Sequence, residues 1–290
     1  MFKYILKEMR PRQWTKNVFV FAALVFDRQL TKIASLERTL AAFVIFCLLS
    51  SSVYIMNDLL DVEADRHHPI KKNRPIAAGN LPISVAIIAA IVLIVISFTA
   101  AFLLSTELGI IVGMYFLVNL AYSIWLKHIP LIDVMIIAFG FVLRVVAGVS
   151  VIQVERFSPW LYIVMSLLAL YIGFGKRRAE MTVLTNESNS SHRKVLDGYT
   201  LALIDQLLTI VSSCTLIAYS FYTFSAPNLP ENHVMMLTIP FVLYGIFRYL
   251  FLIQVKNKGG EPEELLLKDR PLQATVLLWA ITVLVIFYKF

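Results

Sequence analysis

Residues 83–104 read ISVAIIAAIVLIVISFTAAFLL, a run of 22 positions without a charged side chain. A helix needs about 20 mostly apolar residues to cross the hydrocarbon core of a bilayer. The run is continuous rather than alternating, which predicts a transmembrane helix and not a strand of a membrane barrel. Lipid is therefore the expected solvent of this segment.

The rest of the chain continues this pattern. Of 290 residues, 59% are hydrophobic and 16% are charged, whereas about a quarter are charged in a typical soluble domain. The sequence predicts an all-α, polytopic membrane helix bundle that forms one domain over residues 1–290. About nine transmembrane helices are expected, at 16–30, 38–58, 83–104, 108–126, 131–152, 158–175, 200–224, 234–254 and 272–289.

The positive charges indicate the orientation of these helices. With a cytoplasmic N-terminus, the inner segments hold 19 of the 26 Lys and Arg residues, the outer segments hold 5, and 2 lie within spans. Cytoplasmic loops normally carry this excess, so the net charge of +7 predicts no nucleic-acid partner. The inner links at 59–82, 176–199 and 255–271 are long and charged, so the working surface is expected to face the cytoplasm.

An acidic motif ends the second predicted span. Asp58, Asp61 and Asp65 are spaced by three and four residues, which places them on one face of a helix, with Asn57 beside them. Oxygen ligands without His or Cys favour a hard cation, above all Mg²⁺. We therefore expect these three aspartates to bind the metal, and Asp58 and Asp61 to take part in catalysis through it. The alternative is a solvated acidic helix end, or acids paired with the basic loop that follows.

That loop carries cations suited to phosphate. Lys71 and Arg74 are expected to bind phosphate oxygens, while the carboxylates hold the metal that the phosphates chelate. Acidic and basic groups side by side are typical of a site for a magnesium-chelated diphosphate.

The same residues carry a resemblance to a known family. The pattern from Asn57 to Asp65, followed by Asn73-Arg74-Pro75-Ile76-Ala77-Ala78-Gly79, resembles the first aspartate-rich motif of the UbiA-type intramembrane prenyltransferase superfamily. Further stretches resemble its polyprenyl-phosphate phosphoribosyltransferase branch; they begin at Arg10, Asp65, Tyr122, Gly175, Arg193 and Asp269.

This resemblance implies an activity. A polyprenyl (decaprenyl) phosphate would attack phosphoribosyl diphosphate and release diphosphate, with Mg²⁺, in a bacterial plasma membrane as part of cell-wall biosynthesis. The prenyl-to-aromatic branch normally has a second Asp-x-x-x-Asp motif, and no such pair follows Asp65. Lys176, Arg177 and Arg178 occupy the corresponding inner loop, where cations suit the 5-phosphate of the donor.

Other candidates flank the inner links. Lys127 and Asp133 are expected to take part in catalysis, since they border the link between the fourth and fifth spans; anchoring of that loop is the alternative. The residues expected to bind substrate are Lys16, Asn57, Asp65, Lys71, Arg74, Tyr122, Lys176 and Arg177. For Lys16, Lys176 and Arg177 the alternative is the positive charge that normally flanks a cytoplasmic helix end. Glu180 is expected to pair with Lys176 and Arg177.

Three charges lie within predicted spans. Arg144 either lines a lipid-phosphate cavity or pairs with a polar neighbour, while Asp205 and Arg248 are expected to form a structural salt bridge. Transport is the main rival from another class, but transporter sites usually lie at the midplane. Among enzymes, the rival is transfer of a polyprenyl group from its diphosphate to an aromatic acceptor. The length of the acceptor lipid and the oligomeric state stay open.

Overall fold

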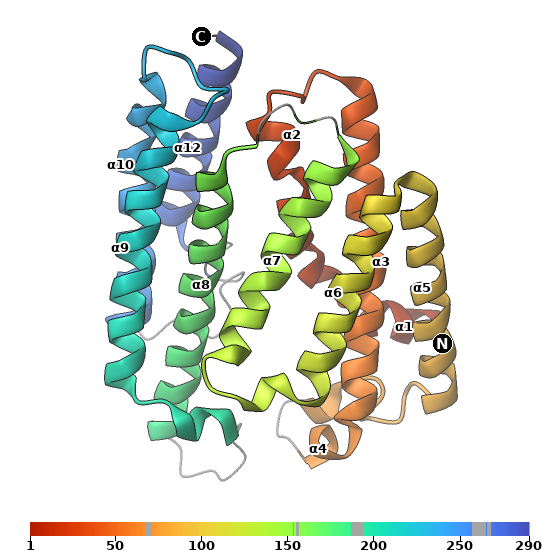
Figure 1. The fold of residues 1–290 in the computed structure, drawn as a ribbon. Helices are drawn as coiled ribbons and strands as arrows, with labels where there is room; N and C mark the ends of the chain where they lie inside the picture. The colour runs from red at the N-terminus through yellow and green to blue at the C-terminus, as the bar shows by residue number, and fades with distance from the viewer. Residues whose placement is uncertain are drawn as a thin grey trace. The chain divides into compact units, whose positions relative to one another are not determined.

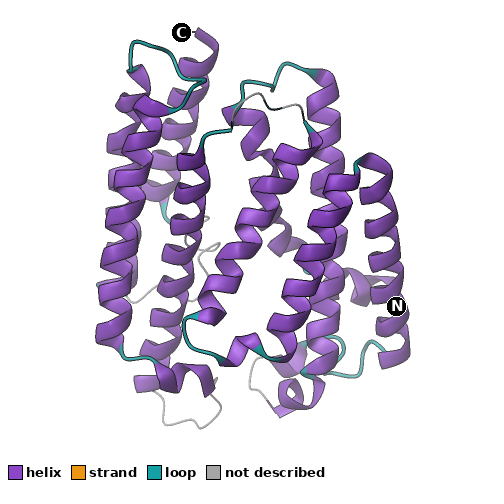
Figure 2. Ribbon diagram, in the orientation of Figure 1, coloured by secondary structure: helices purple, strands orange, loops and turns teal. Residues whose placement is uncertain are grey.

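The structure is a computed structural model that describes residues 1–67, 71–152, 154, 157–186, 194–256, 265 and 268–289. Within these residues all regular secondary structure is helical (Figure 2). The side chains of residues 183–186 and 194 are outside the description. The predicted fold class, a polytopic membrane helix bundle, is confirmed.

Eight helical segments of the described chain are long and apolar enough to cross a membrane. They contain the helices α3 (Ile33–Leu60), α5 (Ile83–Leu104), α6 (Thr106–Ile124), α7 (Ile132–Val151), α8 (Pro159–Asn186), α9 (Leu201–Ser225), α10 (Ile239–Gln254) and α12 (Arg270–Lys289). A 3₁₀ helix, η5 (Val234–Thr238), leads into α10. These eight correspond to the second to ninth predicted spans.

The first predicted span, 16–30, has a different form. A short helix α1 (Phe2–Glu8) precedes an unusually long 3₁₀ helix, η1 (Pro11–Phe21), which continues into the five-residue helix α2 (Ala22–Phe26). A 3₁₀ helix rises about 2 Å per residue, so η1 and α2 together extend about 30 Å, the thickness of the hydrocarbon core. A ninth crossing by this segment stays a prediction.

The chain divides into two compact units, one formed by residues 1–127 and 143–155 and the other by residues 128–142 and 156–290. The single domain predicted over residues 1–290 remains a prediction. In unit 1, α3 packs against η1, α5 and α6 (Figure 1). Serines make the contact with η1 close: Ser51 Oγ accepts from Trp14 Nε1 at 3.0 Å, and Ser50 Oγ accepts from Asn17 Nδ2 at 3.2 Å.

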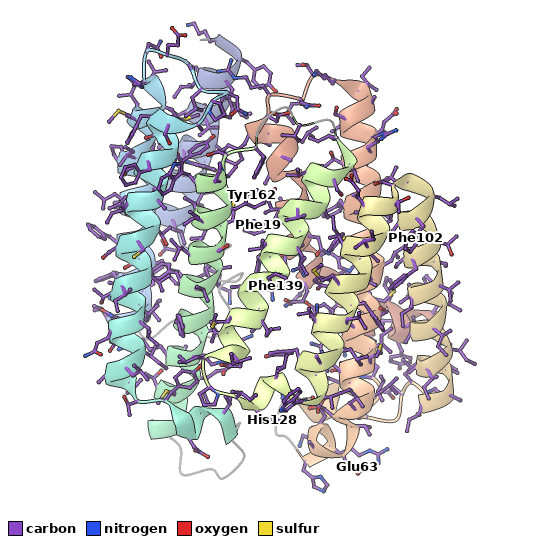
Figure 3. The ribbon with its side chains drawn as sticks, in the orientation of Figure 1. Phe19, Glu63, Phe102, His128, Phe139 and Tyr162 are labelled. Carbon is purple, nitrogen blue, oxygen red and sulfur yellow. The ribbon has the colours of Figure 1, made fainter. Side chains whose placement is uncertain are left out.

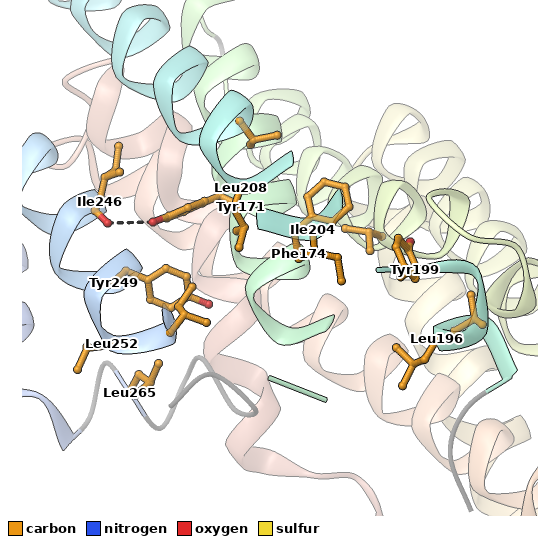
Figure 4. Packing of buried hydrophobic residues seen from close by; sticks show 14 residues of the cluster. Tyr171, Phe174, Leu196, Tyr199, Ile204, Leu208, Ile246, Tyr249, Leu252 and Leu265 are labelled. Carbon is orange, nitrogen blue, oxygen red and sulfur yellow. Dashed lines mark hydrogen bonds between the residues drawn. The ribbon is translucent and has the colours of Figure 1, made fainter. Parts of the chain in front are cut away.

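Unit 2 is built on the neighbouring helices α8 and α9, with α10 packed against both and against α12. Its core joins aliphatic and tyrosine side chains (Figure 4). Tyr171, 1% exposed, donates its hydroxyl to the Ile246 carbonyl at 2.9 Å, and its ring meets the Tyr249 ring edge-on with the centroids 5.1 Å apart. A buried tyrosine hydroxyl needs such a partner, so this bond fixes α8 against α10.

Candidate functional site

The aspartates lie where α3 ends and α4 (Val62–His67) begins (Figure 1). Asp58 belongs to the last turn of α3, Asp61 is its C-cap, and Asp65 lies on α4. The amide of Asp61 donates to the Asn57 carbonyl at 2.9 Å, and the amide of Asp65 donates to the Asp61 carbonyl at 2.8 Å. These i to i−4 bonds continue the helical spacing across the junction, although α3 itself stops at Leu60.

Basic side chains contact all three carboxylates. Arg10 Nη2 donates to both oxygens of Asp58 at 2.5 Å. Arg74 Nη1 donates to Asp58 Oδ1 at 2.9 Å and also to Asp65, so one guanidinium bridges two acids. Asp58 and Asp65 are 3% and 2% exposed, and carboxylates this deeply buried need such compensation.

Two lysines complete the set. Lys127 Nζ donates to Asp61 Oδ1 at 2.9 Å, although Asp61 is 66 positions away in sequence. Lys71 Nζ lies 3.8 Å from Asp65 Oδ1. Asp61 is the most accessible of the three aspartates, with 40% of its side chain exposed. We call Asp58, Asp61, Asp65 and these four basic residues the aspartate cluster.

Local backbone geometry brings the two arginines to the cluster. Arg10 has a φ of 52°, in the left-handed region, and is followed by Pro11 at the start of η1. A non-glycine residue in this region costs on the order of 1–3 kcal/mol and persists only where surrounding contacts impose it, as the bonds to Asp58 do here. Arg74 follows the short 3₁₀ helix η2 (Lys71–Asn73), and its amide donates to the Lys71 carbonyl at 2.9 Å.

A fourth acid, Glu8, lies against the cluster at the end of α1. It is 2% exposed, and its carboxyl group is in hydrogen-bonding contact with Asp58. Burial, reinforced by the negative charge of Asp58, raises the pKa of Glu8 to about 7, against the opposing effect of Arg10. The Glu8 Oε1 atom has no hydrogen-bond partner in the described part of the protein.

The donor chemistry of the cluster suits a hard divalent cation, because the acidic groups present only oxygen atoms. Within the described residues, however, no three His, Cys, Asp or Glu side chains converge closely enough to hold a metal ion. In the described residues each of the three aspartates is paired with arginine or lysine. Pairing with the basic loop that follows was the sequence-based alternative: Lys71 and Arg74 of that loop pair with the acids, and Arg10 and Lys127 join them from elsewhere in the chain.

A second charged cluster belongs to unit 2 and centres on Asp133, which is fully buried. Its Oδ2 accepts from Arg177 Nε at 2.7 Å, and its Oδ1 accepts from the Tyr199 hydroxyl at 2.7 Å. Arg177 also donates to Glu180, as expected for residues three apart on α8. Burial raises the pKa of Tyr199, which keeps its hydroxyl protonated as the donor to Asp133.

This second cluster fixes the loop before α7. The Leu131 amide lies 2.6 Å from the Tyr199 hydroxyl oxygen and donates to it, while Leu131 itself has a φ of 68°. Asp133 was expected to act in catalysis and Arg177 to bind substrate. The structure pairs them with each other, at 0% and 1% exposure. Loop anchoring, the alternative named for Asp133, is the role that this geometry supports.

The remaining predicted substrate-binding residues are half-buried. Lys16 lies on η1, close enough to Tyr115 to affect its hydroxyl electrostatically. The others are Asn57 on α3, Tyr122 on α6 and Lys176 on α8. Their assignment as substrate-binding residues stays a prediction.

The charges within the spans have structural partners. Arg144, 5% exposed, donates to Asn17 Oδ1 and to the Tyr115 hydroxyl, both at 2.8 Å. A polar neighbour was one of the two roles considered for Arg144, and these bonds link α7 to η1 and α6.

The predicted salt bridge between Asp205 and Arg248 is wrong, because each of these residues pairs with a different side chain. Asp205 binds Arg178 of α8 at 2.7 Å, and Arg248 binds Asp269, at the start of α12, at 2.8 Å. Each side chain pairs with a helix that packs against its own, which the order of the spans along the chain does not reveal.

Comparison with known proteins places this geometry in a family. The profile of the UbiA prenyltransferase family matches residues 18–268. The decaprenyl-phosphate phosphoribosyltransferase of Mycobacterium tuberculosis is 34% identical over 96% of this chain and 92% of its own. The enzyme of the same name from Mycolicibacterium smegmatis is 36% identical over 96% of this chain and 91% of its own.

Solved structures agree on the fold. A UbiA homolog from Archaeoglobus fulgidus, bound to GPP and Mg²⁺, matches with a TM-score of 0.75 and 19% identity, over 98% of this chain and 99% of that one. The helical architecture, the aspartates at the end of α3 and the family profile agree with one another. The chain is a multi-pass membrane protein that belongs to the UbiA prenyltransferase family.

Proposed function

We propose that this protein transfers the 5-phosphoribosyl group of phosphoribosyl diphosphate to a polyprenyl phosphate and releases diphosphate. Full-length relatives that share about a third of the sequence carry the name of this activity. The observation that carries the proposal is the aspartate cluster, in which four basic side chains surround three carboxylates. Such a combination suits a metal-chelated diphosphate.

Asp58, Asp61 and Asp65 would hold Mg²⁺ in this proposal. Bound there, the ion supplies charge stabilisation for the diphosphate leaving group. Arg10, Arg74 and Lys127 meanwhile provide donors for phosphate oxygens, since guanidinium and ammonium groups bind phosphate and carboxylate alike. The same side chains that neutralise the acids in this structure are thus suited to bind the donor.

The acceptor requires little activation. A phosphate monoester loses its second proton at a pH of about 6, so the lipid phosphate is a dianion at neutral pH. One of its oxygens forms a bond to C1 of the ribose while the bond from C1 to the diphosphate oxygen breaks. No side chain has to remove a proton, and catalysis rests on position and electrostatics.

In unit 2, the cluster of Asp133, Arg177 and Tyr199 would act by positioning. It fixes the start of α7 and the segment of α8 that carries Lys176, one of the residues expected to contact the 5-phosphate. We further propose that the protein lies in the bacterial plasma membrane with this chemistry at the cytoplasmic face, because the basic residues of both clusters belong to the predicted inner segments.

One assay tests the proposal against its rival. Purified protein would receive Mg²⁺, polyprenyl phosphate and phosphoribosyl diphosphate labelled in the ribose. A parallel reaction would receive a labelled polyprenyl diphosphate and an aromatic acceptor such as a hydroxybenzoate. We expect label from the ribose in an organic-extractable lipid and no product in the parallel reaction. The opposite pattern would assign the chain to prenyl transfer.

A further inference from the structure

Glu8 is a buried acid that the proposed reaction does not yet use. Acidic side chains are almost never fully buried unless they are paired, yet Glu8 is 2% exposed and its Oε1 has no partner in the described residues. An orphaned buried oxygen of this kind calls for an explanation, such as a bound water or ion, or a functional role.

The carboxyl group of Glu8 lies against the aspartate cluster. This carboxyl group is in hydrogen-bonding contact with Asp58, one of the two deeply buried aspartates of the cluster. Arg10 lies only two residues after Glu8 along the chain, and its Nη2 donates to both oxygens of Asp58 at 2.5 Å each. Arg74 bridges Asp58 and Asp65. Both arginines influence Glu8 electrostatically, while their side chains donate hydrogen bonds to the aspartates.

Glu8 adds a fourth acidic group to this region. Three aspartates and Glu8 make four acids, and Arg10, Lys71, Arg74 and Lys127 make four bases. When basic groups turn to the phosphates of a donor, the acids require another cation. Glu8, a carboxylate beside Asp58 with an oxygen that has no partner in the described residues, is then placed to bind that cation together with Asp58.

We propose that Glu8 is a fourth carboxylate of the metal site and supplies its open oxygen to the coordination shell of the divalent cation held with Asp58. Mg²⁺ retains several waters, so Glu8 contacts the ion or one of its waters. The inference rests on the proposed function only in requiring a metal-chelated diphosphate, whichever group that diphosphate carries.

The test measures binding instead of turnover. Full-length protein in nanodiscs would be titrated with inorganic diphosphate by calorimetry at a series of Mg²⁺ concentrations. For Glu8→Gln, which retains the shape of the side chain, we expect the Mg²⁺ concentration at half-maximal binding to rise about ten- to a hundredfold, as for other residues that support a metal ligand. Diphosphate binding without Mg²⁺ should not weaken.

The matched control is Glu63→Gln. Glu63, labelled in Figure 3, lies in the first turn of α4, where its side chain is 73% exposed and bound to Arg66. This variant loses the same charge close to the cluster and should keep the wild-type Mg²⁺ midpoint. Glu8→Asp, which retains the charge but withdraws the oxygen, should shift the midpoint in the same direction as Glu8→Gln.

Two results would overturn the proposal. A wild-type Mg²⁺ midpoint in folded Glu8→Gln or Glu8→Asp would make Glu8 a structural acid that only shares a proton with Asp58. Equal losses of diphosphate binding with and without Mg²⁺ would place its effect on the arginines instead. Because inorganic diphosphate is the probe, either outcome is independent of whether phosphoribosyl transfer is the reaction.

Discussion

Asp58 and Asp61 are three residues apart, but their surroundings differ. Asp58 is 3% exposed and bound by Arg10 and Arg74, whereas the Asp61 side chain is 40% exposed and bound by Lys127. Removing one member of a buried ion pair leaves an uncompensated charge and costs about 3–5 kcal/mol, while exposed pairs contribute about 0–1 kcal/mol. The proposed metal-binding role and the contribution to folding are therefore separable at these two residues.

We predict that Asp58→Asn and Asp61→Asn each lower kcat by at least about two orders of magnitude, because a metal's charge stabilisation is worth several kcal/mol. Only Asp58→Asn should also lower the melting temperature substantially in detergent. Turnover and thermal unfolding measured on the same preparations check both statements. Near-normal activity in folded Asp61→Asn would remove that residue from the metal site.

Lys176 and Arg177 are adjacent on α8, but we expect different roles for them: Lys176 binds substrate and Arg177 supports the structure. Arg177 is buried against Asp133, so Arg177→Ala should destabilise the protein by about 3–5 kcal/mol. Lys176 is half-buried. Lys176→Ala should fold normally and raise KM for phosphoribosyl diphosphate about ten- to a hundredfold, the cost of one charge-assisted hydrogen bond.

Unfolding curves and KM values for both substrates test this pair. A change in KM for the lipid alone would place Lys176 at the acceptor phosphate. Unchanged kinetics in Lys176→Ala would reduce it to flanking positive charge.

Among the elements, η1 depends on close packing within unit 1. The Cα of Gly148 on α7 faces η1 so closely that an added Cβ would lie 1.9 Å from the Val20 carbonyl oxygen. A backbone atom cannot move aside as a flexible side chain does. Gly148→Ala should therefore displace η1, which carries Lys16 and follows Arg10, and should destabilise the protein by about 1–3 kcal/mol with loss of activity.

Gly113→Ala on α6 is the control, since its Cβ would lie 3.7 Å from a Phe98 side-chain carbon, an ordinary contact. This variant should melt at the wild-type temperature or slightly above, because alanine favours a helix. Equal stability of the two variants would contradict the close packing of η1.

The elements also show how far the sequence predicts the fold. Continuous apolar runs were sufficient for eight spans, because lipid requires every backbone group to be bonded within its own helix. The 3₁₀ form of η1 was missed, since its apolar content resembles that of an α-helix. The bonds from Trp14 and Asn17 to the serines of α3 are tertiary contacts and have no local pattern.

For the charged clusters too, local sequence patterns predicted some residues, and tertiary contacts added others. Asp58, Asp61 and Asp65 were predicted from their spacing, and Lys71 and Arg74 from the adjacent loop. Glu8 and Tyr199 were missed because each joins its own cluster from a distant part of the chain, 50 residues from Asp58 and 66 from Asp133 respectively. The Arg10 stretch contributed to the family resemblance, but only the structure pairs it with Asp58.

At the scale of the whole molecule, the charge distribution predicts the topology. With 19 basic residues on inner segments and 5 on outer ones, residues 59–82 should face the cytoplasm and residues 225–233 the opposite side. In a Cys214→Ser background, cysteines at the exposed positions Asn80 and Glu231 should react with a membrane-impermeant maleimide from opposite sides. Labelling from the same side would reject nine crossings with an inside N-terminus.

The reaction itself is tested most directly by following both ends of the donor in one experiment. Phosphoribosyl diphosphate would carry one phosphorus isotope in the 5-phosphate and another in the β-phosphate, and purified protein would receive it with polyprenyl phosphate and Mg²⁺. The account predicts the first isotope in the lipid and the second in inorganic diphosphate, in equal amounts, with neither product in Asp61→Asn. Release of diphosphate without label in the lipid, or no consumption of the donor, would contradict it.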